Sequence, residues 1–208
     1  MKKTMLIVAM LALVCTLAFA ANLVPFGDME DGNTKNWVSE DSTLKIEDKK
    51  GVDNSKGMKV KNSETWSGLA LDVTSVIDMG KSYYIEAWFK LNKAEKGATF
   101  GISFEFRPSQ TRDYAEDWES SCFLTPGEDP FYEDRETTGM DVAASATEWV
   151  KVSGVIRPED METLIDAHGV EITSPITKVV VYFKIDDKHT KGRIFYLDNV
   201  LIEEIPNV

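Results

Sequence analysis

Runs in which apolar and polar side chains alternate fill most of the chain after residue 20, and they restrict its fold more than any other feature. A period of two puts every second side chain on the same face of a β-strand. The clearest runs are residues 69–73, 83–91, 98–106 and 179–185. The side chains expected to point into the core are Leu69, Leu71, Val73, Tyr83, Ile85, Ala87, Phe89, Leu91, Phe100, Ile102, Phe104, Phe106, Val179, Val181, Phe183 and Ile185.

Two further ranges, residues 149–156 and 193–202, are apolar enough to form strands, and only residues 159–168 suggest a helix, which would be short. Gly, Asn, Asp and Pro separate the runs at a spacing typical of a sandwich. The sequence therefore predicts an all-β fold, a two-sheet antiparallel β-sandwich.

The first twenty residues have the features of a secretory signal peptide. Lys2 and Lys3 give a charged start, residues 5–14 are apolar, and Ala18 and Ala20 form a small-x-small cleavage site. The apolar run is about half as long as the roughly 20 residues that span a membrane. We expect cleavage after Ala20, a secreted, extracellular or periplasmic protein, and no membrane attachment after cleavage. The alternative, a lipoprotein modified at Cys15, fits less well because Val14 is not the small residue that usually precedes such a cysteine.

The mature chain is more acidic than the whole. The full sequence has a net charge of −12, and loss of the two leader lysines leaves 21 basic and 35 acidic side chains, a charge of −14. Nucleic acid is excluded as a partner because phosphate binding needs clustered cations. Only Cys122 remains, so no intrachain disulfide forms and the domain depends on its core or on a metal.

Residues 107–147 interrupt the alternating pattern with a dense mixture of acidic and aromatic side chains. Loops of this length inside compact domains are usually functional or disordered, and the aromatic content argues against disorder. We therefore expect residues 21–208 to form one domain, with a long insertion at 107–147.

Four segments together resemble the secreted carbohydrate-binding modules of families four, nine and twenty-two, which are galactose-binding-like jelly rolls. They are NLVPFGDMEDG (22–32), ETWSGLALDVTSVIDMGKSYYIEAWFKL (64–91), TEWVKVSGVI (147–156) and FYLDNVLIEE (195–204). The chain departs from the family pattern at Met29, which replaces the usual Phe. The insertion also falls where family members often place a second aromatic that contacts the ligand.

The candidate sugar-binding residues come from strand parity, from composition and from this resemblance. Trp66 is expected to face away from the core beside Gly68 and Ala70, and the resemblance makes it a stacking tryptophan, with packing against a neighbouring strand as the alternative. Tyr182 and Lys184 are expected on the same sheet face. Within the insertion the most ligand-like residues are Arg112, Tyr114 and Trp118, because Arg binds vicinal hydroxyls in a bidentate manner and Trp stacks on sugar rings.

The resemblance also implies a structural Ca²⁺ that joins the two ends of the chain. Glu30 near the first strand and Asp198 near the last would supply carboxylate oxygens, with Asp28 as a weaker third ligand. The alternative is that these are ordinary acidic turn residues.

The expected function is non-catalytic binding of a β-glucan or xylan in an aromatic-lined groove on one sheet face. Separate glycoside hydrolases or a cell surface are expected associates. The alternative from another class is an extracellular structural sandwich that contacts proteins. An enzyme is disfavoured because the Glu-x-Asp-x-x-Glu strand of jelly-roll glucanases is absent.

Overall fold

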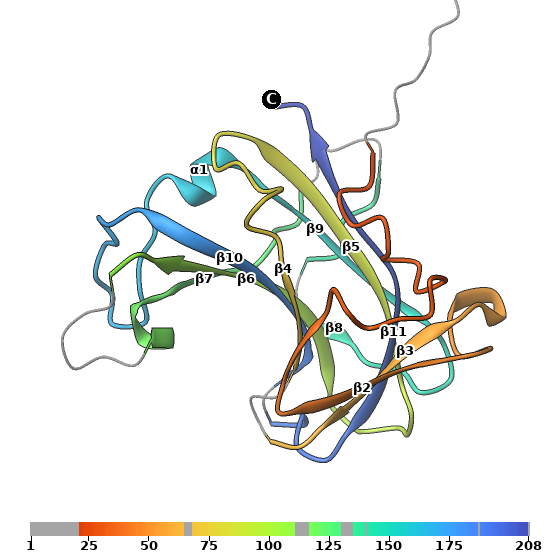
Figure 1. Cartoon of the computed structure of the whole chain (residues 1–208). Coiled ribbons are helices and arrows are strands. Elements are labelled where there is room, and N and C mark those ends of the chain that lie inside the picture. The colour runs from red at the N-terminus through yellow and green to blue at the C-terminus, as the bar shows by residue number, and fades with distance from the viewer. Residues whose placement is uncertain are drawn as a thin grey trace, which may run out of the picture.

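The computed structural model describes residues 21–64, 68–110, 117–129, 135–139, 141–186 and 188–207. The predicted signal peptide, residues 1–20, lies outside these ranges. Two antiparallel sheets face each other across the core (Figure 1). No helix in the described ranges is long and apolar enough to cross a membrane.

Sheet A has the strand order β1-β4-β10-β6-β7, and β8 pairs with β6. Its strands are β1 (Val38–Glu40), β4 (Gly68–Asp72), β10 (Ile176–Ile185), β6 (Thr99–Pro108), β7 (Cys122–Leu124) and β8 (Val142–Ala143).

Sheet B has the order β2-β3-β11-β5-β9. Its strands are β2 (Ser42–Glu47), β3 (Gly57–Asn62), β11 (Ile194–Ile205), β5 (Ser82–Leu91) and β9 (Val150–Ile156). The helical elements are short: η1 (Val52–Asn54), η2 (Asp117–Ser120) and α1 (Pro158–Met161). The predicted all-β sandwich is therefore confirmed.

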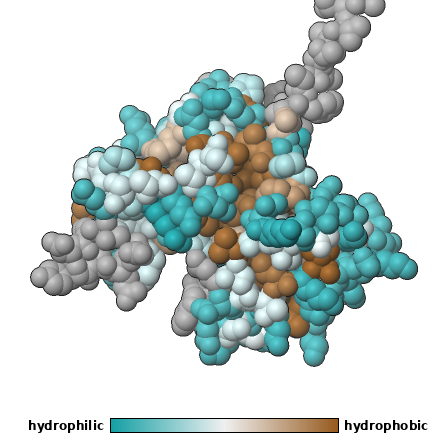
Figure 2. All heavy atoms as spheres, in the orientation of Figure 1, coloured by the Kyte–Doolittle hydropathy of each residue, from teal (hydrophilic) through white to brown (hydrophobic). Residues whose placement is uncertain are grey.

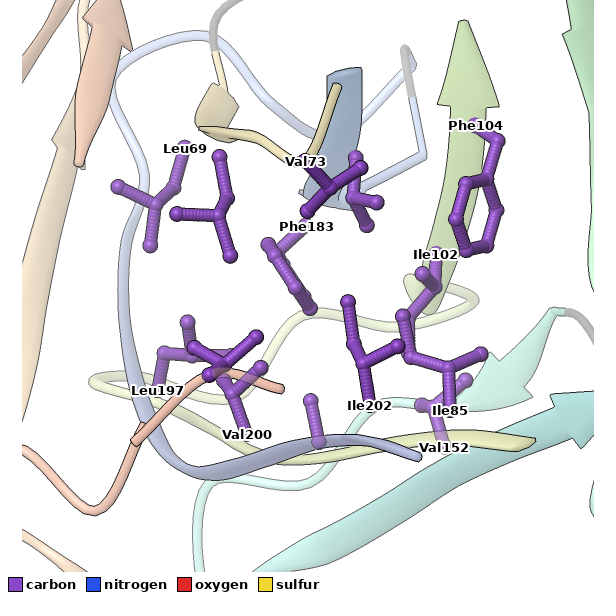
Figure 3. Close-up of a cluster of buried hydrophobic side chains, with 14 of the residues drawn as sticks. Leu69, Val73, Ile85, Ile102, Phe104, Val152, Phe183, Leu197, Val200 and Ile202 are labelled. Atoms are coloured by element: carbon purple, nitrogen blue, oxygen red, sulfur yellow. The ribbon is translucent and has the colours of Figure 1, made fainter. Parts of the chain in front are cut away.

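The core lies between the sheets and contains every side chain that alternation assigned to it. Figure 3 shows Leu69, Phe183 and Ile102 of sheet A pointing toward Ile85, Val152 and Ile202 of sheet B. Across this interface the rings of Phe89 and Phe100 stack with centroids 4.9 Å apart. Each fully buried large apolar side chain contributes roughly 1.5–3 kcal/mol. Figure 2 shows that hydrophilic side chains surround an apolar band on one side of the molecule.

The N-terminal segment, and not the first strand, joins the last strand. Leu23 N donates to Ile202 O at 2.8 Å, and Val200 N donates to Gly27 O at 2.8 Å. The first strand, β1, belongs to the opposite sheet and pairs with β4. The two ends of the chain are therefore adjacent, although by a route that strand order alone did not predict.

The insertion adds to both sheets. Residues Cys122–Leu124 form β7 at the edge of sheet A, and the chain then reaches β9, where Gly127 and Val155 exchange two backbone hydrogen bonds of 2.9 and 3.0 Å. Beyond the undescribed residues 130–134, Arg135 covers the outward ring of Tyr84 on sheet B, 5.1 Å from its centroid. The described part of the insertion thus links the two edges of the sandwich.

Candidate functional site

The outer face of sheet A carries large polar side chains among small neighbours. Tyr182 of β10 stands opposite Ala70 of β4 and Ser103 of β6. Lys184, two residues further along β10, stands opposite Gly101. These small neighbours are buried, as are Gly68, Glu105 and Val180, so Tyr182, Lys184 and Arg107 are the side chains through which this face reaches solvent. We call this surface the platform; it consists of the outward residues Gly68, Ala70, Gly101, Ser103, Glu105, Arg107, Val180, Tyr182 and Lys184.

A charged hydrogen-bond cluster lies at the centre of the platform. The Tyr182 hydroxyl donates to Glu105 Oε2 at 2.8 Å and accepts from Arg107 Nη2 at 2.9 Å. Arg107 Nη2 also lies 2.7 Å from Glu105 Oε2. Burial disfavours the charged form of Arg107, but the hydrogen bond and the charge of Glu105 outweigh this effect and raise the pKa of Arg107. The guanidinium therefore stays charged.

Exposure divides the roles within this cluster. Glu105 is 1% exposed, so it serves to hold its partners in place. Tyr182 is only half-buried, and the Arg107 side chain is 31% exposed. Tyr182 and Arg107 are consequently the members that can reach a ligand.

Exposed apolar side chains border the platform at both edges of sheet A. Val38 of β1 stands opposite Ala70 and is 47% exposed, and Phe123 of β7 stands opposite Glu105 and is 45% exposed. A sugar ring offers an apolar C–H face and equatorial hydroxyls, which match apolar surface and fixed polar groups respectively. The platform presents both kinds of group side by side.

Comparisons with known proteins agree with this geometry. Residues 21–122, about half of the chain, match a family model described as "Carbohydrate binding domain". The chain has the fold and family signature of a carbohydrate-binding module. A search of curated proteins finds no match to this sequence.

Several solved structures share the fold of the module. The first family 22 xylan-binding domain of Xyn10C from Paenibacillus barcinonensis is 14% identical, with a TM-score of 0.60 over 88% of this chain and 94% of that chain. The second family 22 domain of the same protein is 17% identical, with a TM-score of 0.56 over 86% and 98%. A Clostridium thermocellum xylanase 10B structure with xylohexaose is 19% identical, with a TM-score of 0.55 over 84% of this chain and 27% of that chain.

The predicted sugar-binding residues are distributed over several parts of the module. Tyr182 and Lys184 both belong to the platform. Trp118 lies in η2, outside the platform, and is 54% exposed. The remaining three, Trp66, Arg112 and Tyr114, lie outside the described residues.

The charged platform residues Glu105 and Arg107 and the bordering apolar residues Val38 and Phe123 were not selected from the sequence. Glu105 and Arg107 follow from the same alternation that put Phe104 and Phe106 in the core, so parity alone could have found them. Val38 and Phe123 lie in strands of three residues, which are too short to show a period.

The acidic residues expected at the chain ends converge on one loop. Asp198 Oδ2 accepts hydrogen bonds from Val52 N at 2.7 Å and from Ser55 Oγ at 2.8 Å. Glu30 Oε1 accepts from Lys56 N at 2.7 Å. Asp28 instead caps its own turn, accepting from Glu30 N at 3.1 Å.

Asp198 lies in a closely packed environment where the 51–56 loop meets β11. Asp198 is fully buried, and its pKa is raised by burial and, to a smaller extent, by the charge of Glu30. A Cβ added to Gly51 would lie 2.4 Å from Asp198 Oδ2, so only glycine fits this close approach. The Lys56 ammonium lies 3.0 Å from Glu30 O, which shows that the loop accommodates positive charge. Two carboxylates with loop carbonyls beside them are the donor set of Ca²⁺, although no group of three or more His, Cys, Asp or Glu that could hold a metal occurs among the described residues.

Proposed function

We propose that this protein is secreted and binds a neutral β-linked polysaccharide of the xylan class on the platform of sheet A, without cleaving it. The observation that carries the proposal is the Tyr182, Glu105 and Arg107 cluster, set among small residues on the outward face of the sheet. The family 22 xylan-binding domains that share the fold support xylan as the ligand class.

The chemistry of the platform supports a role in binding. Glu105 accepts hydrogen bonds from both partners, which leaves the Tyr182 ring and the Arg107 guanidinium fixed before a ligand arrives. A fixed binding group loses little conformational entropy on association. Planar side chains of this kind can donate to vicinal equatorial hydroxyls.

We propose further that Glu30 and Asp198 hold a structural Ca²⁺, with backbone carbonyls of the 51–56 loop as additional ligands. The ion would neutralise the two carboxylates and fix this loop against β11. Its role would be to stabilise the domain, away from the platform.

Affinity electrophoresis on gels with soluble xylan, mixed-linkage β-glucan or no polysaccharide tests the proposed function. Xylan should retard the protein, and Trp66→Ala and Tyr182→Ala should each reduce the retardation while leaving the thermal unfolding curve nearly unchanged. Trp88→Ala serves as the matched control, because Trp88 is a half-buried tryptophan on the outer face of sheet B. Absence of retardation on every polysaccharide would favour the structural, protein-contacting alternative. Release of reducing ends from xylan would show that the protein is an enzyme.

A further inference from the structure

The outer face of sheet B carries a cleft of about 400 Å³ that the proposed function does not use. Its walls come from the loop before β3, from the end of β5, from β11 and from the segment before β9. The volume lies within the roughly 300–1,000 Å³ typical of small-ligand sites. The cleft is on the opposite side of the sandwich from the platform, since Tyr196 in its wall points away from the core-facing Phe195 and Leu197.

Three lysines make this cleft positive in a strongly acidic chain. Lys49, Lys50 and Lys90 line it, and among the described residues none of them forms an ion pair. Asp53 is the only acidic side chain among the described residues of the lining. The net charge of the whole sequence is −12, so unpaired cations gathered in one place are unusual for this protein.

Neighbouring lysines on the same sheet behave differently. Lys45 and Lys59 lie in register with each other on the outer face of sheet B. Both contact Glu47 Oε1, at 3.2 and 3.3 Å. The single Glu47 carboxylate therefore offsets part of their charge, whereas among the described residues no ion pair offsets the charge of the cleft lysines.

Aromatic and amide side chains complete the lining. Trp149 is half-buried in the wall, and the Lys50 ammonium lies 5.7 Å from the ring centroid of Tyr196. The Tyr196 hydroxyl donates to Asn92 Oδ1 at 3.4 Å. Aromatic surface suits the C–H face of a sugar ring, amides suit its hydroxyls, and ammonium groups suit a carboxylate.

The loop that carries the first two lysines is held in place. Gly51 N donates to Ser55 O at 2.9 Å, and Asp198 of β11 binds the loop at Val52 N and Ser55 Oγ. Tyr196 belongs to the same strand as Asp198. Strand β11 therefore positions both the loop that carries Lys49 and Lys50 and the aromatic ring of Tyr196. The cleft is thus organised before any ligand enters.

We propose that this cleft binds a uronic acid residue of an acidic polysaccharide. The uronate carboxylate lies among Lys49, Lys50 and Lys90, and its ring packs against Trp149. The site is separate from the platform, so this inference does not depend on xylan binding there.

The test uses an oligogalacturonide and the same oligosaccharide after its carboxyl groups have been reduced to alcohols. Calorimetry at low salt should show binding of the oligogalacturonide and none of the reduced form, and added salt should weaken the binding. The Lys50→Gln/Lys90→Gln double variant should lose about tenfold in affinity for each lysine removed, because each supplies a charge-assisted hydrogen bond. The single variant Trp149→Ala should also weaken binding of the oligogalacturonide, but its binding should keep the salt dependence of the wild type.

The matched control is Lys35→Gln/Lys61→Gln, which makes the same charge change at two exposed lysines that lie outside the cleft lining and form no ion pair among the described residues. An equal loss in both double variants would overturn the site in favour of general charge attraction. Equal binding of the reduced oligosaccharide would overturn the role of the carboxylate. Displacement of the oligogalacturonide by an equal concentration of inorganic phosphate would show a simple anion site and not a saccharide site. Tyr182→Ala should leave oligogalacturonide binding intact. Loss of xylan binding at the platform can therefore be distinguished from loss of oligogalacturonide binding in the cleft.

Discussion

The hydroxyl of Tyr182 is the one atom of the platform that contacts both charged partners, Glu105 and Arg107. The two partners also contact each other directly at 2.7 Å. Removal of the hydroxyl therefore leaves their ion pair in place. A typical hydrogen bond contributes about 1 kcal/mol to stability, so the fold should tolerate the change.

Tyr182→Phe should accordingly lower the affinity for xylan several-fold while lowering Tm by no more than about 4 °C. Affinity electrophoresis and thermal unfolding measure the two quantities. Tyr196→Phe is the matched control, since it removes a tyrosine hydroxyl from the outer face of sheet B. A loss of xylan affinity in both variants, or in neither, would count against the platform.

Strand parity was sufficient to place Tyr182 on the outward face, but not to identify its partners. Tyr182 and Glu105 are 77 residues apart, and they meet only because β10 pairs with β6 in one particular register. The alternating pattern fixes which face each residue occupies, whereas the register depends on packing of the whole sheet. The contacts of Tyr182 with Glu105 and Arg107 could therefore be identified only from the structure.

The contact between β9 and the insertion depends on Gly154. A Cβ at this position would lie 2.8 Å from both Gly127 O and Pro126 Cβ. Backbone atoms cannot move aside without breaking the two hydrogen bonds between Gly127 and Val155. Any larger residue at position 154 should therefore push the insertion away from the edge of sheet B.

Gly154→Ala should lower the free energy of unfolding by about 1–3 kcal/mol, as expected for overpacking. Urea denaturation measures this loss, and hydrogen exchange should show faster exchange at the Gly127 and Val155 amides. Xylan binding should be retained, because the platform lies on the other sheet. Gly127→Ala provides the control, since a Cβ there meets nothing within 4 Å. Equal destabilisation by the two changes would rule out the proposed steric cause.

Asp186 ties the end of β10 to the start of β6. Its Oδ2 accepts from Thr99 N at 2.9 Å, and its Oδ1 lies 2.7 Å from the His189 ring and accepts from Lys188 N at 3.2 Å. Burial of the carboxyl opposes its ionisation, but the Thr99 and His189 hydrogen bonds outweigh burial and lower the pKa of Asp186. The folded chain thus favours the carboxylate more than the unfolded chain does.

Since the folded-state pKa is the lower one, the Asp186 carboxylate stabilises the fold above the unfolded pKa of about 3.9 and loses this effect as pH falls through the folded pKa. Asp186→Asn should cost about 1–2 kcal/mol at pH 7 and should lose less stability than the wild type below about pH 4. Denaturation curves across pH measure both effects. Asp48→Asn, which also removes one carboxylate but in an exposed turn after β2, is the matched control. Parallel pH curves for Asp186→Asn and the wild type would contradict this role of the carboxylate.

Six strands were predicted from the sequence, whereas β2 and β3, of six residues each, were missed although Leu44 and Ile46, and Met58 and Val60, alternate with polar residues in them. β4, β5, β6 and β10 alternate over five to ten residues, so their existence and their inward residues followed from period two. β1 and β7 have three residues each and β8 has two, too few to show any period. Pairing with a longer neighbour, and not local preference, creates these short strands.

At the scale of the whole molecule, the two outer faces of the sandwich differ in chemistry, which the net charge of the chain does not reveal. The platform on sheet A has a compensated charge cluster bordered by apolar side chains. The cleft on sheet B has uncompensated lysines beside aromatic rings. Net charge alone indicated only that nucleic acid is an unsuitable partner, because a sum over residues contains no information about their positions. The composition therefore excluded nucleic acid as a partner but could not predict the lysine-lined cleft.

The proposed Ca²⁺ would act on the whole molecule, because Glu30 belongs to the N-terminal segment and Asp198 to the last strand. Binding to the folded state alone adds about 2.7 kcal/mol at a free concentration 100 times Kd. For a domain of this size that corresponds to a rise of about 5–10 °C in Tm. Calcium should therefore raise Tm and a chelator should lower it, as measured by calorimetry, with Mg²⁺ much less effective because it demands a stricter octahedral geometry.

Asp198→Asn should abolish the response of Tm to calcium, whereas Asp28→Asn should retain most of this response because Asp28 caps its own turn. A Tm that is insensitive to chelator in the wild type would rule out the proposed Ca²⁺ site.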